Sequence, residues 1–150
     1  MAREEAQAVL DLAIRKEQET HQVYQQAAQA TTDRGVKALA TELAEEELNH
    51  AKVLRSLELG RLQEHELARI QTLGISDFLL DKPTLEGAGL QDVLIFAMKR
   101  EEKAHSFMAK MAEAVEDSLT RKLLEILAQE ELKHKARLET FYEQVFLKEN

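Results

Sequence analysis

Apolar residues recur at about every third or fourth position along four long segments of the chain. The first segment carries Leu10, Ala13 and Tyr24 on one such stripe, and the second carries Leu39 and Leu43. This is the period of an α-helix that buries one face and exposes the other. The pattern predicts long helices over about residues 2–30, 34–59, 90–116 and 118–147.

The breaks between the predicted helices differ in length. Asp33 lies between the first two helices, and Asp117 or Ser118 between the last two, and these residue types favour the start of a helix. Residues 60–89 hold four of the five glycines and the single proline. We therefore predict two antiparallel helical hairpins joined by a long crossover over residues 60–89, with a short helix at about residues 61–73.

The two predicted hairpins are related by an internal repeat. When residue n is laid on residue n+84, residues 13–54 match residues 97–138 at 14 of 42 positions without a gap. Matches at Ala, Leu and Glu are expected from their abundance, but His21 and His50 also find a histidine in register, and the chain has only five. The hairpins are therefore predicted to be copies related by a pseudo-twofold axis.

Composition narrows the fold and the classes of function. The chain has 150 residues, of which only 5% are aromatic, and helix-forming residues are abundant. This length fits one domain over residues 1–150, and the composition favours an all-α fold. The absence of cysteine excludes disulfides, thiol catalysis and zinc–thiolate or iron–sulfur sites.

Charge and hydropathy exclude two classes of partner. The formal net charge is −8, and no basic stretch stands out from the carboxylates, which argues against a nucleic-acid partner. The first residues carry charges throughout, and no run of about 18 apolar residues occurs that could span a membrane. We expect a cytoplasmic protein with no membrane partner.

Carboxylates interrupt the apolar stripes of two helices at mid-height. Glu17 lies on the same stripe as Leu10 and Tyr24, and thus on the inward face of the first helix. Glu101 takes the corresponding place in the third helix, on the stripe that holds Met108. Each of these helices is therefore predicted to carry one Glu into the core.

The other two helices each carry a Glu-x-x-His pair on the inward face. Glu47 and His50 lie between leucines of the second stripe, and Glu131 and His134 repeat this arrangement in the fourth. Side chains at this spacing are neighbours on one face of a helix, roughly 5–6 Å apart at Cβ, so they can bind one ion. A single pair of this kind is more often a surface ion pair, so the inference depends on its repetition.

Four carboxylates that converge in a core cannot all stay charged without a positive charge among them. No Lys or Arg lies on the four stripes at this level, whereas two divalent cations would balance four Glu and accept two neutral imidazoles. We therefore predict two metal ions. Iron suits this oxygen and nitrogen ligand set, with manganese or zinc as alternatives. The predicted ligands are Glu17, Glu47, His50, Glu101, Glu131 and His134.

The segments around these ligands resemble a known family. One Glu on each of two helices and Glu-x-x-His on each of the other two is the pattern of ferritin-like di-metal four-helix bundles. Within that superfamily the chain resembles the rubrerythrins, through the segments AIRKEQETHQVYQQAA, LAEEELNHAKVL, FAMKREEKAHSFMAKMA and LAQEELKHKARLETFY. The resemblance implies a ferritin-like antiparallel four-helix bundle and a di-iron oxidoreductase that acts on peroxide or dioxygen.

The resemblance also implies roles for single residues. Glu47 and Glu131 would bridge the two metals, the other four ligands would each bind one ion, and Tyr24 would donate a hydrogen bond to a ligand. Two features depart from the family, because rubrerythrins have a further Glu where this chain has Ala104, and because they carry a cysteine-ligated iron domain that supplies electrons. We therefore expect an external electron donor, and a homodimer, since many relatives associate through helix faces.

Two other functions stay open at this point. One is a ferroxidase or iron-handling protein that passes its iron on, and the other is a non-enzymatic scaffold whose metal site is structural. Three histidines also lack an assigned role. His21 and His105 each lie four residues after a predicted ligand and could reach either the site or solvent, while His65 is expected in solvent. Glu102, three residues before His105, lies off the inward stripe.

Overall fold

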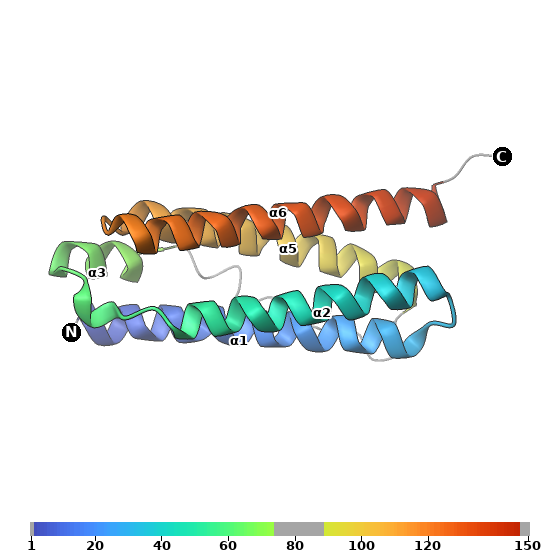
Figure 1. The fold of residues 1–150 in the computed structure, drawn as a ribbon, viewed down its shortest axis with the longest axis horizontal. Coiled ribbons are helices and arrows are strands. Elements are labelled where there is room, and N and C mark those ends of the chain that lie inside the picture. Colours follow the sequence, from blue (N-terminus) through green and yellow to red (C-terminus); the bar gives the residue numbers. More distant parts are fainter. Residues whose placement is uncertain (1, 74–88, 148–150) are drawn as a thin grey trace.

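The computed structural model describes residues 2–73 and 89–147, and all the regular structure in these ranges is helical (Figure 1). The two hairpins lie side by side, with α1 packed on α2 and α5 packed on α6. This confirms the predicted all-α four-helix architecture with a short helix in the crossover. The elements are α1 (Ala2–Ala30), α2 (Arg34–Arg55), the 3-10 helix η1 (Leu59–Arg61), α3 (Glu64–Gln71), α5 (Leu90–Ala114) and α6 (Ser118–Phe146).

The second helix of each hairpin begins at a capping aspartate. The Asp33 carboxylate accepts a hydrogen bond from the Val36 N–H at 3.0 Å, and Asp117 accepts one from the Thr120 N–H at 2.9 Å. Both bonds satisfy backbone donors that the first turn of a helix leaves unpaired. Asp33 is therefore the predicted cap, and of the two candidates in the second hairpin it is the aspartate that acts.

The second helix was predicted to reach residue 59, and this boundary is wrong. α2 ends at Arg55, where the Ser56 hydroxyl donates to the Val53 carbonyl at 2.6 Å and closes the last turn. The chain then turns so that Leu59 enters the core within η1. The helix therefore stops before Leu59, which packs in the core as part of η1. The short crossover helix is likewise shorter than predicted, since it spans only Glu64–Gln71.

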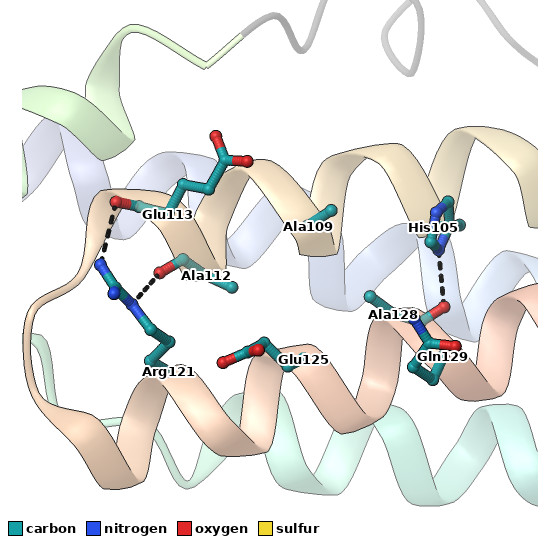
Figure 2. Close-up of a pocket in the computed structure, with 8 residues that line it drawn as sticks. All are labelled: His105, Ala109, Ala112, Glu113, Arg121, Glu125, Ala128 and Gln129. Carbon is teal, nitrogen blue, oxygen red and sulfur yellow. Dashed lines mark hydrogen bonds between the residues drawn. The ribbon is translucent and has the colours of Figure 1, made fainter.

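The third helix ends at Ala114, two residues before its predicted end. Val115 is extended and almost fully buried, which removes it from the helical path. The Arg121 guanidinium donates to the carbonyls of Ala112 and Val115, both at 3.0 Å, and so satisfies acceptors at the end of α5. Figure 2 shows the bond to Ala112. The remainder of the predicted crossover, residues 74–88, lies outside the described residues.

The apolar core is divided by a polar layer. One cluster of buried side chains fills the end of the bundle that α3 covers and includes Leu10, Leu54 and Leu124. Another fills the other end and includes Leu43 and Leu138. On each of the four long helices the predicted ligands lie between the residues of these two clusters. The fold therefore sets a band of ionisable groups across the middle of the bundle, sealed by apolar packing on both sides.

None of the helices within residues 2–73 and 89–147 has an apolar stretch long enough to cross a membrane.

Candidate metal centre

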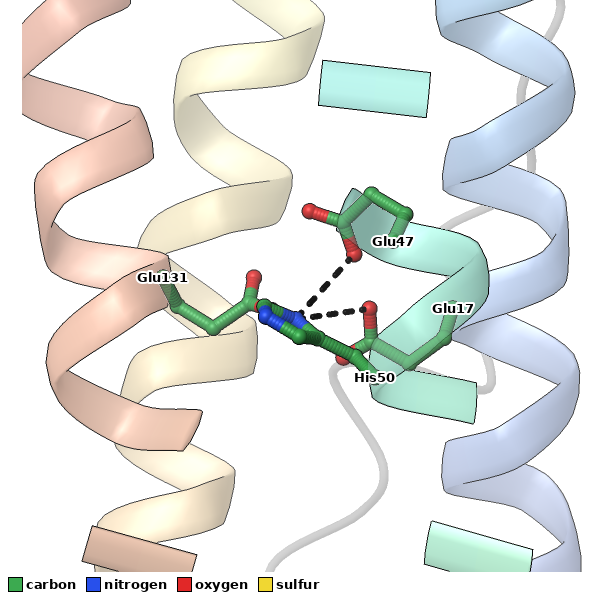
Figure 3. A group of neighbouring side chains, drawn as sticks. All are labelled: Glu17, Glu47, His50 and Glu131. Carbon is green, nitrogen blue, oxygen red and sulfur yellow. Dashed lines mark hydrogen bonds and ion pairs between the residues drawn. The ribbon is translucent and has the colours of Figure 1, made fainter. Parts of the chain in front are cut away.

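All six predicted ligands meet in the polar layer, and each is at most 3% exposed. Their ligand atoms form two groups, and within each group the atoms lie within 4.8 Å of one another. The first group is Glu17, Glu47, His50 and Glu131, which come from α1, α2 and α6 and point toward one another in Figure 3. The second group is Glu47, Glu101, Glu131 and His134.

Glu47 and Glu131 belong to both groups. The two groups therefore share two carboxylates, and each adds one Glu and one His of its own. A carboxylate has two oxygens and can bind two cations at once. This is the arrangement that a dinuclear site requires, with Glu47 and Glu131 placed between two ion positions.

The two imidazoles reach across the bundle from opposite sides. His50 Nδ1 contacts Glu131 Oε1 of the other hairpin, and His134 Nδ1 lies 3.0 Å from Glu47 Oε1. The rings are parallel to within 5°, with centroids 5.4 Å apart. The repeat seen in the sequence is thus also a symmetry of the site. Each histidine contacts the shared glutamate of the other hairpin.

The outer nitrogens of both rings face carboxylates that the sequence analysis did not assign. His50 Nε2 lies 2.7 Å from Glu130 Oε2, and His134 Nε2 lies 3.3 Å from Glu46 Oε2. Both glutamates are partly exposed, and their positions on the helix faces therefore predicted contact with solvent. A signal was available, because Glu46 and Glu130 are identical across the repeat. A carboxylate on the outer nitrogen orients a ligating imidazole and raises its basicity.

Tyr24 also enters the polar layer, as predicted. Its hydroxyl donates to Glu101 Oε1 at 2.6 Å, which links α1 of one hairpin to α5 of the other. Burial and the charge on Glu101 raise the pKa of Tyr24 well above its usual value of 10.0, so the phenol keeps its proton. The repeat places Met108 at the corresponding position of α5, so only one of the two halves has this donor.

Burial changes the protonation of the four carboxylates. Desolvation, followed by repulsion from other carboxylates including Glu101, raises the pKa of Glu47 and Glu131 well above 4.5. Desolvation also raises the pKa of Glu17. Burial acts in the same direction on Glu101, but hydrogen bonds with neighbours, Glu131 first among them, outweigh it and hold the pKa at about 2. Without cations, burial therefore favours the protonated form of Glu17, Glu47 and Glu131.

The donor set fits two metal ions. One oxygen of each of the four core carboxylates is buried without a hydrogen-bond partner, and a buried polar atom of this kind is costly unless something binds it. The unpartnered oxygens are Oε2 of Glu17, Glu47, Glu101 and Glu131. Carboxylate oxygen and imidazole nitrogen, with no sulfur, are the ligands of iron, manganese and zinc in proteins.

A family comparison agrees with this geometry. The rubrerythrin family model matches residues 8–142, which is most of the chain and includes all six candidate ligands. The chain belongs to the rubrerythrin family. Comparisons with curated proteins and with solved structures gave no match.

Ala104 lies at the position where, by the resemblance, rubrerythrins have a further Glu. Its side chain is 6% exposed and belongs to the apolar cluster at the α3 end of the bundle. Methyl packing therefore takes the place of a fifth carboxylate, and the two hairpins supply equal sets of three candidate ligands. The site is more symmetric for this reason.

Two basic residues are buried close to the site, which the stripe analysis did not predict. Arg100 is 1% exposed, and its guanidinium donates to the Lys16 carbonyl at 3.3 Å and lies over the Phe96 ring. Lys16 is 7% exposed and lies 3.3 Å from Glu19. The hydrogen bond to Lys16 connects α5 to α1, whereas the ring contact stays within α5 and the ion pair within α1. They stabilise the contact between hairpins and leave the unpartnered oxygens of the core carboxylates without a hydrogen bond.

His21 and His105 stay out of both ligand groups. The His21 Nδ1–H donates to the Ala44 carbonyl at 2.6 Å, and His105 donates to the Ala128 carbonyl at 2.7 Å. Each bond joins the two helices of one hairpin. His105 also borders a groove of about 580 Å³ on the α5–α6 seam, outside the polar layer (Figure 2). Glu102, three residues before it, is exposed and belongs to neither ligand group of the polar layer.

Replacing His21 by Ala should lower stability and leave metal binding unchanged. The substitution removes a part-buried hydrogen bond, which contributes about 1 kcal/mol, and should lower the melting temperature by about 2–4 °C. Differential scanning calorimetry of the metal-free protein measures the shift, with exposed Gln22→Ala as the control. Loss of bound metal in His21→Ala would show instead that this ring belongs to the site.

Proposed function

We propose that this protein is a di-iron oxidoreductase that reduces hydrogen peroxide, with dioxygen as the other candidate oxidant. The observation that carries the proposal is that two buried groups of ligands share Glu47 and Glu131. Members of the rubrerythrin family are typically di-iron oxidoreductases, which favours iron and this class of reaction. Two ferrous ions bound here would supply the two electrons that reduction of peroxide to water requires.

A surface groove supports access for a small oxidant. It has a volume of about 280 Å³ and runs between α2 and α6, where it is lined by Glu46, His50, Ile126 and Glu130 among others. His50 is thus both a candidate ligand and a wall of the groove. A molecule as small as peroxide could reach the polar layer from this side without opening the apolar ends of the bundle.

The chain's own groups suit proton handling at this site. Tyr24 keeps its proton and directs it to Glu101, the one core carboxylate whose pKa is lowered. Glu46 and Glu130 lie at the outer nitrogens of the two imidazoles and at the edge of solvent. We infer that the tyrosine orients Glu101 and that Glu130, which is hydrogen-bonded to the outer nitrogen of His50, fixes that ring.

Electrons are proposed to come from a separate donor. The chain contains no cysteine, so it cannot hold the cysteine-ligated iron that supplies electrons in rubrerythrins proper.

The proposed homodimer is tested by light scattering of the purified protein.

The test is anaerobic loading with ferrous ion followed by mixing with peroxide. The loaded protein should oxidise faster than free ferrous ion at the same concentration, as followed by stopped-flow absorbance. Tyr24→Phe keeps the ring and removes the hydroxyl, so it should retain two ions per chain while slowing the reaction. Oxidation no faster than that of free ferrous ion would refute the proposal.

The fate of the iron separates this proposal from iron handling. A cofactor should remain at about two ions per chain after gel filtration and repeated oxidation cycles. Iron that is cargo should leave or exchange with added chelator after each turnover. An unchanged iron content with many turnovers therefore supports the oxidoreductase, while stoichiometric loss of iron supports a ferroxidase or delivery role.

A further inference from the structure

A second cluster of metal-binding side chains lies at the end of the bundle where α3 packs on α1 and α5. It consists of His65 and Glu66 in the first turn of α3 and Glu116 in the α5–α6 connection. One ligand atom from each residue lies within 4.8 Å of the other two. None of these residues takes part in the dinuclear site.

Glu66 provides the observation that points to a ligand. Its side chain is 5% exposed, and its Oε2 is buried with no hydrogen-bond partner. Its neighbours in the cluster are half-exposed, with 46% exposure for the His65 side chain and 49% for Glu116. The cluster therefore has an inner carboxylate with an unsatisfied oxygen and an outer rim that is open to solvent.

The two rim residues are already drawn together. His65 Nε2 lies 2.8 Å from Glu116 Oε2, which brings the crossover helix onto the end of α5. Arg69 also contacts this oxygen, at 3.2 Å. The Arg69 side chain is 50% exposed, and exposed ion pairs of this kind contribute little, so it can move away at small cost.

We propose that His65, Glu66 and Glu116 form a mononuclear site for a divalent transition metal ion such as Zn²⁺. One imidazole and two carboxylates give three protein ligands, and the open rim leaves room for water to complete the coordination. The imidazole disfavours Ca²⁺ and Mg²⁺, which take oxygen ligands. A metal here would satisfy the buried Glu66 oxygen and join α3 to the α5–α6 connection.

Equilibrium dialysis of the full chain against Zn²⁺ tests the proposal by counting ions. The wild type should bind about three ions per chain, two in the core and one at this cluster. Glu66→Gln, which keeps the size of the side chain, should bind one ion fewer, and so should His65→Ala and Glu116→Gln. The matched controls are Glu64→Gln on α3 and Glu113→Gln on α5, both exposed, which should bind as many ions as the wild type.

A second readout locates the ion. Amide NMR signals of residues 64–71 and 113–117 should shift with the last equivalent of Zn²⁺ in the wild type and stay fixed in Glu66→Gln. If Glu66→Gln binds as many ions as the wild type, or if these signals do not move, the proposal is overturned. Failure of the core site would instead remove two ions from every variant alike, so the two outcomes are distinguishable.

Discussion

Replacing Glu47 by Gln should abolish binding of both metal ions, while replacing Glu17 by Gln should remove only one. Glu47 belongs to both ligand groups, whereas Glu17 belongs to one. Glutamine keeps the shape of the side chain but loses the charge and one of the oxygens that a bridging carboxylate uses. Iron content after anaerobic loading and gel filtration should fall from about two ions per chain to near zero in Glu47→Gln and to about one in Glu17→Gln.

The repeat supplies an internal check on this result. Glu131→Gln should behave as Glu47→Gln does, and Glu101→Gln as Glu17→Gln does, because the groups are related residue by residue. Exposed Glu45→Gln removes the same charge from α2 and should keep both ions. All four core variants should lose rapid oxidation of ferrous ion by peroxide, because the reaction needs both ions.

Misfolding can be separated from loss of ligands. Removing a desolvated carboxylate should leave the metal-free protein at least as stable as the wild type, since Glu47 is buried with an unpartnered oxygen. Equal loss of iron in Glu17→Gln and Glu47→Gln, with both variants folded, would contradict the shared-ligand arrangement.

The convergence of the six candidate ligands was predictable because of where these residues interrupt the sequence pattern. A charged residue on an apolar stripe is rare, and the same interruption recurs in all four helices. The caps were predictable because Asp33 and Asp117 act through local backbone contacts. Features fixed by residues near in sequence, or by a repeat, were therefore accessible without the structure.

Features that depend on contact between distant helices were not accessible. α2 ends four residues before its predicted end, and the chain beyond it brings Leu59 into the core within η1, a contact that the helical pattern does not show. Arg100 is buried because α1 supplies the Lys16 carbonyl and the Thr20 hydroxyl. Glu46 and Glu130 lie on helix faces that indicate solvent, and apart from their identity across the repeat nothing marks them until the opposite hairpin brings an imidazole to each. In each case the partner lies too far along the chain for a periodic pattern to indicate it.

The metal-free protein should lose stability as pH rises from about 5 to 8, and the iron-loaded protein should gain it. Burial raises the folded-state pKa of Glu47 and Glu131 well above the value of 4.5. Their contribution to stability is therefore complete below pH 4.5 and is lost as pH rises through the folded pKa, because the unfolded carboxylates ionise first. Burial lowers the pKa of His134, but the contacts of this ring with Glu101 outweigh burial, so that the pKa is raised. His134 therefore also contributes stability that is lost as pH rises.

Bound metal reverses the direction in which stability changes with pH, because the metal binds the ionised carboxylates and the neutral imidazoles. Loading must release protons from Glu47 and Glu131, so affinity for the metal and the stability it confers increase with pH. The pKa of Glu101 is about 2, so this residue stays ionised throughout the range and does not contribute to the change of stability with pH. Each kcal/mol lost or gained should move the melting temperature by about 2–4 °C.

Melting curves by circular dichroism from about pH 5 to 8, with chelator and with iron under anaerobic conditions, measure both slopes. The control is the Glu47→Gln/Glu131→Gln double variant, which keeps the rest of the chain's acidic surface. Its melting temperature should change less with pH than that of the metal-free wild type, and iron should not alter it. A metal-free wild type that becomes more stable toward pH 8 would show that the core carboxylates do not hold protons in place of metal.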